Sequence, residues 1–412
     1  MRVLQINTVY QNGGSTGRIV HDLLTLQMSH GIEGFVAYGY DTNNQQTKNV
    51  LGLQGTIRRK VNILRTRLYD MHGFYNEYET RKLIRWMDEI HPDIIHLHNL
   101  HNHYIHVGML FEYIKSHHIP VIWTLHDCWP MTGHCAYFDY VGCEKWKCGC
   151  RHCPSLKEYP PTWFIDRTRQ NYARKMATFQ NVESLTLVTP SKWLANLTRE
   201  SFLSHYPVCV INNGIDTTIF HLQENDDLRI RMGLRDKSIL LYVANVVNER
   251  KGINSLLEIR EKLSDDERLV IVGTDPHAQR LLKSGKCICI KRTDSIQELA
   301  AYYNMANVFI NPTLEDNFPT TNLEALACGT PVVTYRTGGS VESVDEKSGR
   351  IVEKEDAEGM LEAARAIIRQ GKEHYRNYCA EKANRLYNKS VQFEKYIELY
   401  QKIHIEELGK QT

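Results

Sequence analysis

The chain has 412 residues, of which 42% are hydrophobic and 24% charged, a balance typical of a soluble globular protein rather than a fibrous or disordered one. Its 50 basic and 48 acidic side chains leave a formal charge of +2, so the overall charge does not favour a nucleic-acid partner. At about 150 residues per domain, this length predicts two or three domains.

The N-terminal segment MRVLQINTVYQ lacks a charged stretch followed by an apolar one. No run of about 18 apolar residues follows, so we expect neither a signal peptide nor a transmembrane helix. We therefore expect a cytoplasmic protein, at most peripheral on the inner face of the cytoplasmic membrane. Its eleven cysteines should then stay reduced.

Short β-branched runs alternate with helical patterns along the whole chain, which predicts parallel sheets covered by helices on both faces. The pattern occurs twice, so we expect an α/β protein with two doubly wound domains. Their predicted ranges are 1–205, with an insert at 128–160, and 206–390, followed by a C-terminal helix at 391–412 that packs back toward the first domain. Predicted strands begin near residues 2, 34, 93, 120, 185, 239, 268, 287, 307 and 331, and predicted helices span 16–30, 163–179, 253–263 and 295–305.

The first strand is followed by NGGSTGR, residues 12–18, which opens a helix. Glycines there permit close backbone approach, and a helix N-terminus offers free N–H groups to a phosphate. The segment matches neither GxGxxG nor the P-loop pattern, which disfavours a nicotinamide enzyme or a P-loop nucleotidase. A plain tight turn remains the alternative.

The segment from Thr56 to Asp70 is basic and has helical spacing of its apolar residues. Its apolar residues at helical spacing are Ile57, Val61, Leu64 and Leu68, and its basic residues are Arg58, Arg59, Lys60, Arg65 and Arg67. Such a surface suits anionic lipid headgroups. A solvated helix packed on the first sheet is the alternative.

Five histidines lie between His96 and His106, and His98 and Asn99 reach the predicted carboxyl end of a strand. A metal site, hydrogen bonding to an acceptor sugar from His98, Asn99 or His101, and ordinary loop histidines are all open. The next strand ends at His126 and Asp127, at the edge where open parallel sheets bind ligands.

The insert that follows holds five cysteines between Cys135 and Cys153, with one CxC and one CxxC pattern. Zn²⁺ accepts four thiolates at such spacing, and a short loop without its own core needs a staple of this kind. The predicted ligands are Cys135, Cys143, Cys150 and Cys153. Reduced thiols or disulfides are the alternatives, and a thioredoxin-like use of CRHC is disfavoured by the Pro-rich context.

In the second half, NERKG places Arg250 and Lys251 directly before Gly252 and a helix. A cation and a helix N-terminus at that position would neutralise a diphosphate. Further on, residues 311–333 predict a strand, a polar loop and a helix from about Thr321 that Gly329 ends. Asp316 and Glu324 in this segment would accept hydrogen bonds from two sets of vicinal hydroxyls, unless they only cap the helix and face solvent.

Taken together, these motifs resemble the family-4 retaining glycosyltransferases of the GT-B fold, and among them the bacterial enzymes of capsule, colanic-acid and O-antigen assembly. The resemblance covers essentially the whole chain: the Gly-rich first loop, His126, TPSKW, NNGID, Lys251–Gly252, and the acidic pair followed by LEALACGTPVV. It implies two Rossmann-like domains facing a cleft. It also implies that a sugar moves from a UDP- or GDP-sugar to a lipid-linked or glycan acceptor, with its anomeric configuration kept and without a catalytic metal.

The resemblance assigns roles by position in this sequence. Lys251 would bind the donor diphosphate, Glu324 the ribose and Asp316 the transferred sugar. The implied catalytic residues are His126, Lys251 and Asp316; the donor-binding residues are Gly13, Gly14, Arg250, Lys251, Glu315, Asp316, Asn317, Phe318, Pro319, Thr320 and Glu324; the acceptor-binding residues are His98, Asn99, His101 and Asp127.

Two positions depart from the family pattern. Asp316 stands where the family usually has Glu, with Glu315 beside it, so either carboxylate could take the role. Val246 stands where an arginine is common, and Arg250 would substitute for it. A GT-B sugar-nucleotide epimerase and a non-catalytic module that binds glycan or nucleic acid remain alternative functions.

Overall fold

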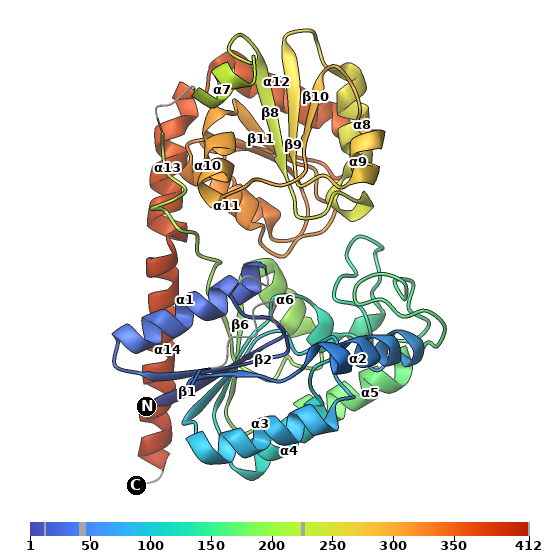
Figure 1. Ribbon diagram of the computed structural model, residues 1–412, viewed down its shortest axis with the longest axis vertical. Coiled ribbons are helices and arrows are strands. Elements are labelled where there is room, and N and C mark those ends of the chain that lie inside the picture. Colours follow the sequence, from blue (N-terminus) through green and yellow to red (C-terminus); the bar gives the residue numbers. More distant parts are fainter. Residues whose placement is uncertain (12–13, 41–46, 224–226, 411–412) are drawn as a thin grey trace. The chain divides into compact units, whose positions relative to one another are not determined.

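The computed structural model describes residues 1–11, 14–40, 47–223 and 227–410 of the chain. The described residues form two compact units. The N-terminal unit comprises Met1–Ile211 and the C-terminal segment from Phe393, and the C-terminal unit comprises Asn212–Gln392. Each unit is an α/β structure built on its own parallel sheet (Figure 1).

The described part of the N-terminal unit contains a seven-stranded sheet with the order β3-β2-β1-β4-β5-β6-β7, in which every neighbouring pair is parallel. Buried β-branched and aromatic residues fill its central strands, as expected for a sheet covered on both faces. The strands are β1 (Arg2–Asn7), β2 (Glu33–Tyr38), β3 (Val50–Gly52), β4 (Ile94–Leu97), β5 (Val121–Thr124), β6 (Leu185–Thr189) and β7 (Val208–Val210).

Alternate strand residues bury opposite faces of this sheet. Val3 and Ile122 pack on one face against α1 and the C-terminal helix α14, and Leu4 and Trp123 pack on the other against α3, α4 and α5. The helices are α1 (Ser15–Ser29), α2 (Thr56–Tyr69), α3 (Glu77–Ile90), α4 (Val107–Ser116), α5 (Thr168–Phe179), α6 (Lys192–Glu200) and α14 (Lys389–Lys410).

The described part of the C-terminal unit contains a six-stranded parallel sheet with the order β10-β9-β8-β11-β12-β13. Helices α8 and α12 pack together beside it, and α10, α11 and α13 form a second group (Figure 1). The elements are α7 (Asp227–Arg231), β8 (Ser238–Val243), η3 (Glu249–Lys251), α8 (Ile253–Lys262), β9 (Glu267–Val272), α9 (Pro276–Leu281), β10 (Cys287–Ile290), α10 (Ile296–Met305), β11 (Val308–Asn311), α11 (Thr320–Ala327), β12 (Val332–Tyr335), η4 (Ser340–Ser343), β13 (Gly349–Val352), α12 (Ala357–Gln370) and α13 (Glu373–Tyr387).

In each sheet the strand order reverses beside one strand. The neighbours of β1 are β2 and β4, and those of β8 are β9 and β11. Open α/β sheets bind ligands at the carboxyl ends of the strands at such a reversal, because the loops there diverge to opposite faces. The loops after β1, β4, β8 and β11 are therefore where each unit should place its functional side chains.

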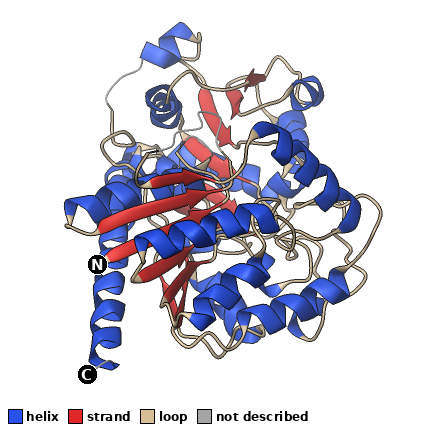
Figure 2. Ribbon diagram, turned by 60° about the horizontal axis from the view of Figure 1, so that its bottom comes forward, coloured by secondary structure: helices blue, strands red, loops and turns tan. Residues whose placement is uncertain are grey.

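The predicted α/β class and all ten predicted strands are confirmed, and helices line the strands of both sheets (Figure 2). The helix predicted over 163–179 is wrong at its start, because α5 begins at Thr168. Asp166 ends the preceding loop by accepting the Thr168 backbone N–H at 2.8 Å, and residues 163–167 are not helical. The short edge strands β3, β7 and β13 were not predicted, because three or four residues carry too little periodicity.

Residues 128–167 are largely irregular and include the short 3-10 turns η1 (Trp129–Met131) and η2 (Lys145–Lys147). The segment lies beside α2 and α5, since Trp163 donates its backbone N–H to the Arg67 carbonyl and Tyr172 donates its hydroxyl to the Trp146 carbonyl. Among the described helices, none combines the length and apolar character needed to cross a bilayer.

Candidate active site

A chain of hydrogen bonds joins Gln5 of β1, His98 after β4 and His126 after β5. Gln5 Oε1 lies 3.3 Å from His98 Nε2, and His98 Nδ1 lies 3.0 Å from His126 Nε2. The Gln5 amide nitrogen donates to the Val20 carbonyl and to Gln27, so its oxygen is the acceptor for His98. His98 therefore carries its proton on Nε2, and His126 donates its own Nε2 proton to His98 Nδ1.

The histidines of this relay are uncharged. Desolvation lowers the pKa of His126 to about 4, an effect that the Asp127 charge opposes and His101 reinforces. Burial, with His96 and His126 nearby, also holds the pKa of His98 well below its ordinary value. The rings of His98 and His126 stack with their centroids 5.3 Å apart. At neutral pH the end of β5 thus presents a neutral imidazole whose acceptor nitrogen is Nδ1.

A second pair lies next to this relay. His101 Nε2 is 2.8 Å from Asp127 Oδ2, and Asp127 Oδ1 accepts the Trp129 backbone N–H at 2.9 Å. Burial would raise the pKa of Asp127, but the charge and hydrogen bond of His101 and the Trp129 N–H lower it. Both side chains are buried, and the Tyr159 hydroxyl approaches the other ring nitrogen of His101 at 3.4 Å.

The loop after β1 lies at the same carboxyl edge of the N-terminal sheet. Gly14 caps α1 with φ at +96°, a left-handed value that favours glycine, and a Cβ added there would meet open space. Asn99, after β4, is fixed through its backbone, which bonds to Asn7, Thr8 and Tyr104. Gly13 lies outside the described residues.

In the C-terminal unit, the turn after β8 holds Arg250 and Lys251. Asn248 accepts the Lys251 backbone N–H at 3.0 Å and so fixes the turn. Gly252 follows with φ at +85°, and an added Cβ there would clash with the Pro312 carbonyl oxygen at 2.1 Å. Glycine is thus required for the turn after β8 to pack against the loop after β11.

That packing brings the predicted cations and carboxylates together. Lys251 Nζ lies 2.5 Å from Asp316 Oδ2, and Arg250 donates to the Glu315 carbonyl at 3.0 Å. The Asp316 and Lys251 side chains remain partly exposed, whereas Glu315 is buried. Of the two adjacent carboxylates, Asp316 is therefore the one that can meet a ligand.

Glu324 lies on α11, whose N-terminus follows this loop directly. The Tyr303 hydroxyl donates to Glu324 Oε2 at 2.9 Å and orients the carboxylate. Burial, together with the Glu324 charge, holds the pKa of Tyr303 well above its ordinary value, so the phenol stays a donor. Pro319 precedes the helix and provides no side-chain cap for the first-turn N–H groups of Thr320 and its neighbours.

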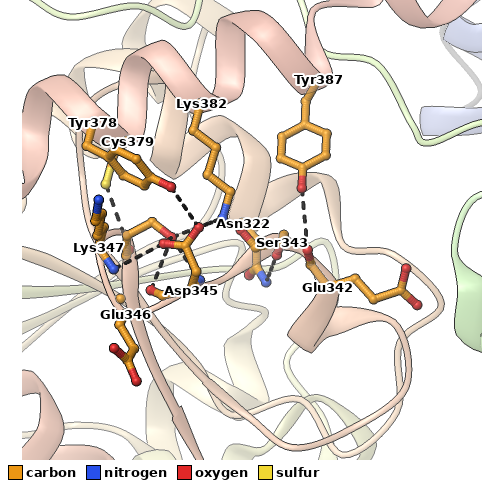
Figure 3. Close-up of polar contacts among 12 residues, drawn as sticks. Asn322, Glu342, Ser343, Asp345, Glu346, Lys347, Tyr378, Cys379, Lys382 and Tyr387 are labelled. Carbon is orange, nitrogen blue, oxygen red and sulfur yellow. Dashed lines mark hydrogen bonds and ion pairs between the residues drawn. The ribbon is translucent and has the colours of Figure 1, made fainter.

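A buried polar network joins α11 to η4 and α13 and so holds α11 in place. Asn322 accepts from Asn311 and donates to Ser340 and Ser343, and Lys382 of α13 donates to the Ser343 carbonyl and to Asp345 (Figure 3). Burial would raise the pKa of Asp345, but hydrogen bonds from Lys382, Ser348 and Tyr378 lower it to about 2. The loop containing Asn317 and Phe318 is tied separately, because Asn213 donates to the Phe318 carbonyl at 3.0 Å.

Several of these residues were not predicted from the sequence. Gln5 is a polar side chain inside the apolar strand RVLQIN, and that contrast was an available signal. Tyr303 and Lys382 had no comparable signal, because each lies in an ordinary amphipathic helix far from the residues it contacts. The predicted metal ligands Cys135, Cys143, Cys150 and Cys153 are free thiols in the described structure.

Two family models match the chain. Residues 16–219 match the model described as Glycosyltransferase Family 4, and residues 237–370 match the model described as Glycosyl transferases group 1. The chain belongs to glycosyltransferase family 4. Both family descriptions concern glycosyl transfer, so neither the epimerase nor the non-catalytic binding module is favoured.

Relatives of this glycosyltransferase include WcaC of Escherichia coli K12, a glycosyl transferase named for colanic acid biosynthesis. It is 27% identical over 98% of this chain and 100% of its own length. A GDP-mannose-dependent phosphatidylinositol monomannoside mannosyltransferase of Mycolicibacterium smegmatis is 31% identical over 44% of this chain and half of its own length. Anabaena HepE, crystallised with UDP, superimposes with a TM-score of 0.69 at 12% identity, covering 98% of this chain and all of HepE, which confirms the GT-B fold.

Proposed function

We propose that this glycosyltransferase transfers a sugar from a nucleoside-diphosphate sugar to a glycan or lipid-linked acceptor during assembly of a surface polysaccharide. The contact between Lys251 and Asp316 carries the proposal, because it sets a cation beside a carboxylate at the carboxyl edge of the C-terminal sheet. WcaC is named for colanic acid biosynthesis, the mycobacterial relative for a GDP-mannose donor, and HepE was crystallised with UDP.

The leaving group of such a donor is a nucleoside diphosphate. Lys251 has three ammonium protons, so it can keep its contact with Asp316 and still donate to a phosphate oxygen. The first-turn N–H groups of α11 add fixed donors and the positive end of a helix dipole. These groups stabilise the departing diphosphate without reorganising, and we infer that transfer needs no catalytic metal.

The two carboxylates bind hydroxyl groups at opposite ends of the donor in this proposal. Glu324, oriented by Tyr303, accepts from the ribose, and Asp316 accepts from the transferred sugar. We propose same-face attack assisted by the departing phosphate, with retention of configuration, because the family pattern supplies no separate carboxylate nucleophile.

The acceptor side of the proposal rests on the edge of the N-terminal sheet. There the neutral His126 presents a ring acceptor, and Gln5 and His98 hold its tautomer. In this proposal His126 lies near the transferred sugar. Asn99 lies at the same edge, while His101 and Asp127 are buried against each other and would act by positioning their neighbours.

The activity test uses the full chain and a panel of UDP- and GDP-sugars. We expect slow release of UDP or GDP from one donor without acceptor, and faster release with an acceptor extract. Product NMR should show the anomeric configuration of the donor, and Mg²⁺ or Mn²⁺ should not change the rate after chelation. Absence of nucleoside diphosphate release from every donor would contradict the proposal.

We further propose that α2 contacts an anionic membrane surface. Its outward face carries Ile57 (81% exposed), Val61 and Leu64, whereas the side chains of Asn62 and Thr66 are buried. A helix that turns its apolar residues outward and buries polar ones is not explained by packing on its own sheet. The exposed Lys60 and Arg65 suit anionic headgroups.

The loop before α5 extends this surface. Trp163 and Phe164 are exposed, and the Arg67 guanidinium lies 5.5 Å from the Trp163 ring. Phosphatidylglycerol vesicles should co-sediment the protein, and phosphatidylcholine vesicles should not. The double variant K60E/R65E should lose binding, while Ile405→Ser, which changes an exposed apolar residue of α14, should keep it. Equal binding to both vesicles, or no effect of K60E/R65E, would contradict this surface.

A further inference from the structure

Four thiols of the insert line one cavity. Cys135, Cys143, Cys150 and Cys153 all belong to its wall, whereas the fifth cysteine of this segment, Cys148, is exposed and is not part of it. The four come from a largely irregular stretch of chain, and Cys135 and Cys150 are buried. Of the five cysteines from Cys135 to Cys153, four therefore line a common cavity and one does not.

Two sulfur atoms in this group already interact. Cys135 and Cys153 are within hydrogen-bonding distance of each other, and the backbone N–H groups of Gly133 and Ser155 donate to Cys150 and Cys153. An added Cβ at Gly133 would lie 2.2 Å from the Thr168 carbonyl oxygen and 2.8 Å from the Cys150 Cβ, so glycine is required for this approach.

The cavity wall also has polar groups that lack a partner. The indole Nε1 of Trp146 is buried with no acceptor in the described structure, and an indole N–H can only donate. His134 lines the same wall with Nδ1 held 2.5 Å from Asp70, and its buried Nε2 has no partner either. Buried polar atoms without partners are rare in native proteins and indicate a missing group.

A buried lysine lies close by. Lys175 of α5 is fully enclosed, donates to the Trp129 carbonyl at 2.7 Å, and is near enough to Cys135 and Cys150 for their charge to act on it. Its ammonium also lies 3.5 Å from the centroid of the Trp129 ring. Four thiolates around Zn²⁺ carry a net charge of −2, which, together with the nearby carboxylates of Asp70 and Asp127, would attract the Lys175 ammonium.

We propose that one structural Zn²⁺ is bound by Cys135, Cys143, Cys150 and Cys153. In this proposal the Trp146 indole N–H and the Lys175 side chain stabilise the negative charge of the four sulfur atoms. Among the described residues, no three potential ligands stand close enough to hold a metal as they are, so the thiols must close in around the ion. Closure would release their protons and give the irregular insert a covalent-like staple that its small core cannot supply.

The first test is metal analysis of the full chain purified without chelator from zinc-supplemented medium. We expect about one zinc per chain, and release of that zinc by a mercurial that modifies thiols. Co²⁺ exchanged into the protein should show the thiolate charge-transfer and d–d absorption of a tetrahedral site. These measurements use the unaltered protein, so they hold even if cysteine variants fold poorly.

The second test separates the four cavity thiols from the fifth. Cys150→Ser and Cys153→Ser should each lose most of the bound zinc, whereas the matched control Cys148→Ser should keep it. Zinc-free wild-type protein would overturn the proposal. So would equal loss from C148S and C150S, or a Cys135–Cys153 disulfide found by mass spectrometry of protein kept under reducing conditions.

Discussion

The carboxyl edges of the two sheets differ in the charge of their polar side chains. The N-terminal edge is built from desolvated, neutral histidines whose tautomers are set by hydrogen bonds, as in the chain from Gln5 through His98 to His126. The C-terminal edge is built from ions, with Lys251 against Asp316 and Glu324 held by a phenol. In the proposed function, the neutral edge serves a hydroxyl acceptor and the ionic edge serves the donor diphosphate.

The largest effect should come from Lys251. Lys251→Ala removes the cation proposed to hold the diphosphate, and loss of one preorganised donor to a transition-state charge lowers kcat by roughly 10²–10³-fold. Transfer is measured by nucleoside diphosphate release. Lys262→Ala removes another lysine of the same unit, one paired with Glu358, and should leave the rate within about twofold. A K251A protein with wild-type turnover and an unchanged circular dichroism spectrum would end the assignment.

Next in size is the effect of Glu324. In Glu324→Gln the neutral amide accepts more weakly from the ribose, and hydrogen bonds to a charged group contribute about 1.5–3 kcal/mol. We expect kcat/KM for the donor to fall roughly 10- to 100-fold at 1.4 kcal/mol per tenfold change. Tyr303→Phe, which keeps the carboxylate and removes its orienting hydroxyl, should give a smaller loss. Equal losses of kcat/KM for E324Q and Y303F would indicate that both variants disturb the local structure, and would contradict a direct role of Glu324 in ribose binding.

The pH profile of transfer tests whether the histidines of the N-terminal edge are neutral. Because the pKa of His126 is about 4, its charge does not change between pH 6 and 8, and kcat/KM should be flat over that range. The activity of His126→Ala should be lower by a constant factor across the same range. An acid limb with a midpoint near 6.5 that disappears in H126A would show that the histidine titrates normally and that the relay is not formed in solution.

The remaining predictions concern acid stability rather than catalysis. Burial lowers the pKa of His96 to about 3 in the folded state, below the ordinary value of 6.5. The unfolded chain then binds more protons between these values, so this histidine supports folding above pH 6.5 and its contribution is lost as the pH falls toward 3. His96→Gln, which can still bond to Tyr400 and Thr124, should flatten the pH dependence of unfolding by up to about 1.4 kcal/mol per pH unit.

A corresponding substitution in the C-terminal unit should change stability in a different pH range. Asp345 has a folded pKa of about 2, so its contribution is present above its ordinary pKa and is lost only between about 4 and 2. Lys382→Met should therefore lower the free energy of unfolding above about pH 4 and reduce its pH dependence between about 4 and 2, while the slope between pH 6.5 and 4 stays unchanged. Chemical unfolding followed at several pH values distinguishes the two, and a common window for H96Q and K382M would contradict the comparison.

Much of this protein follows from local sequence. Apolar runs of four to six residues, separated by helical periodicity, determine a parallel α/β fold, because only a sheet covered on both faces buries such strands. The order of motifs also places His126, Lys251, Asp316 and Glu324 after strands, where parallel sheets collect ligands. The apolar spacing of α2 was visible too, although its outward orientation was not.

Tertiary structure alone decided how these groups pair. Asp316 rather than Glu315 meets Lys251, because Glu315 is buried and Asp316 is partly exposed. Gly252 lets the turn after β8 pack against the loop after β11 that holds both. Gln5, Tyr303 and Lys382 acquire their roles through contacts across 21 to 93 positions of sequence. Such contacts depend on strand register and helix packing, which join residues that no local pattern connects.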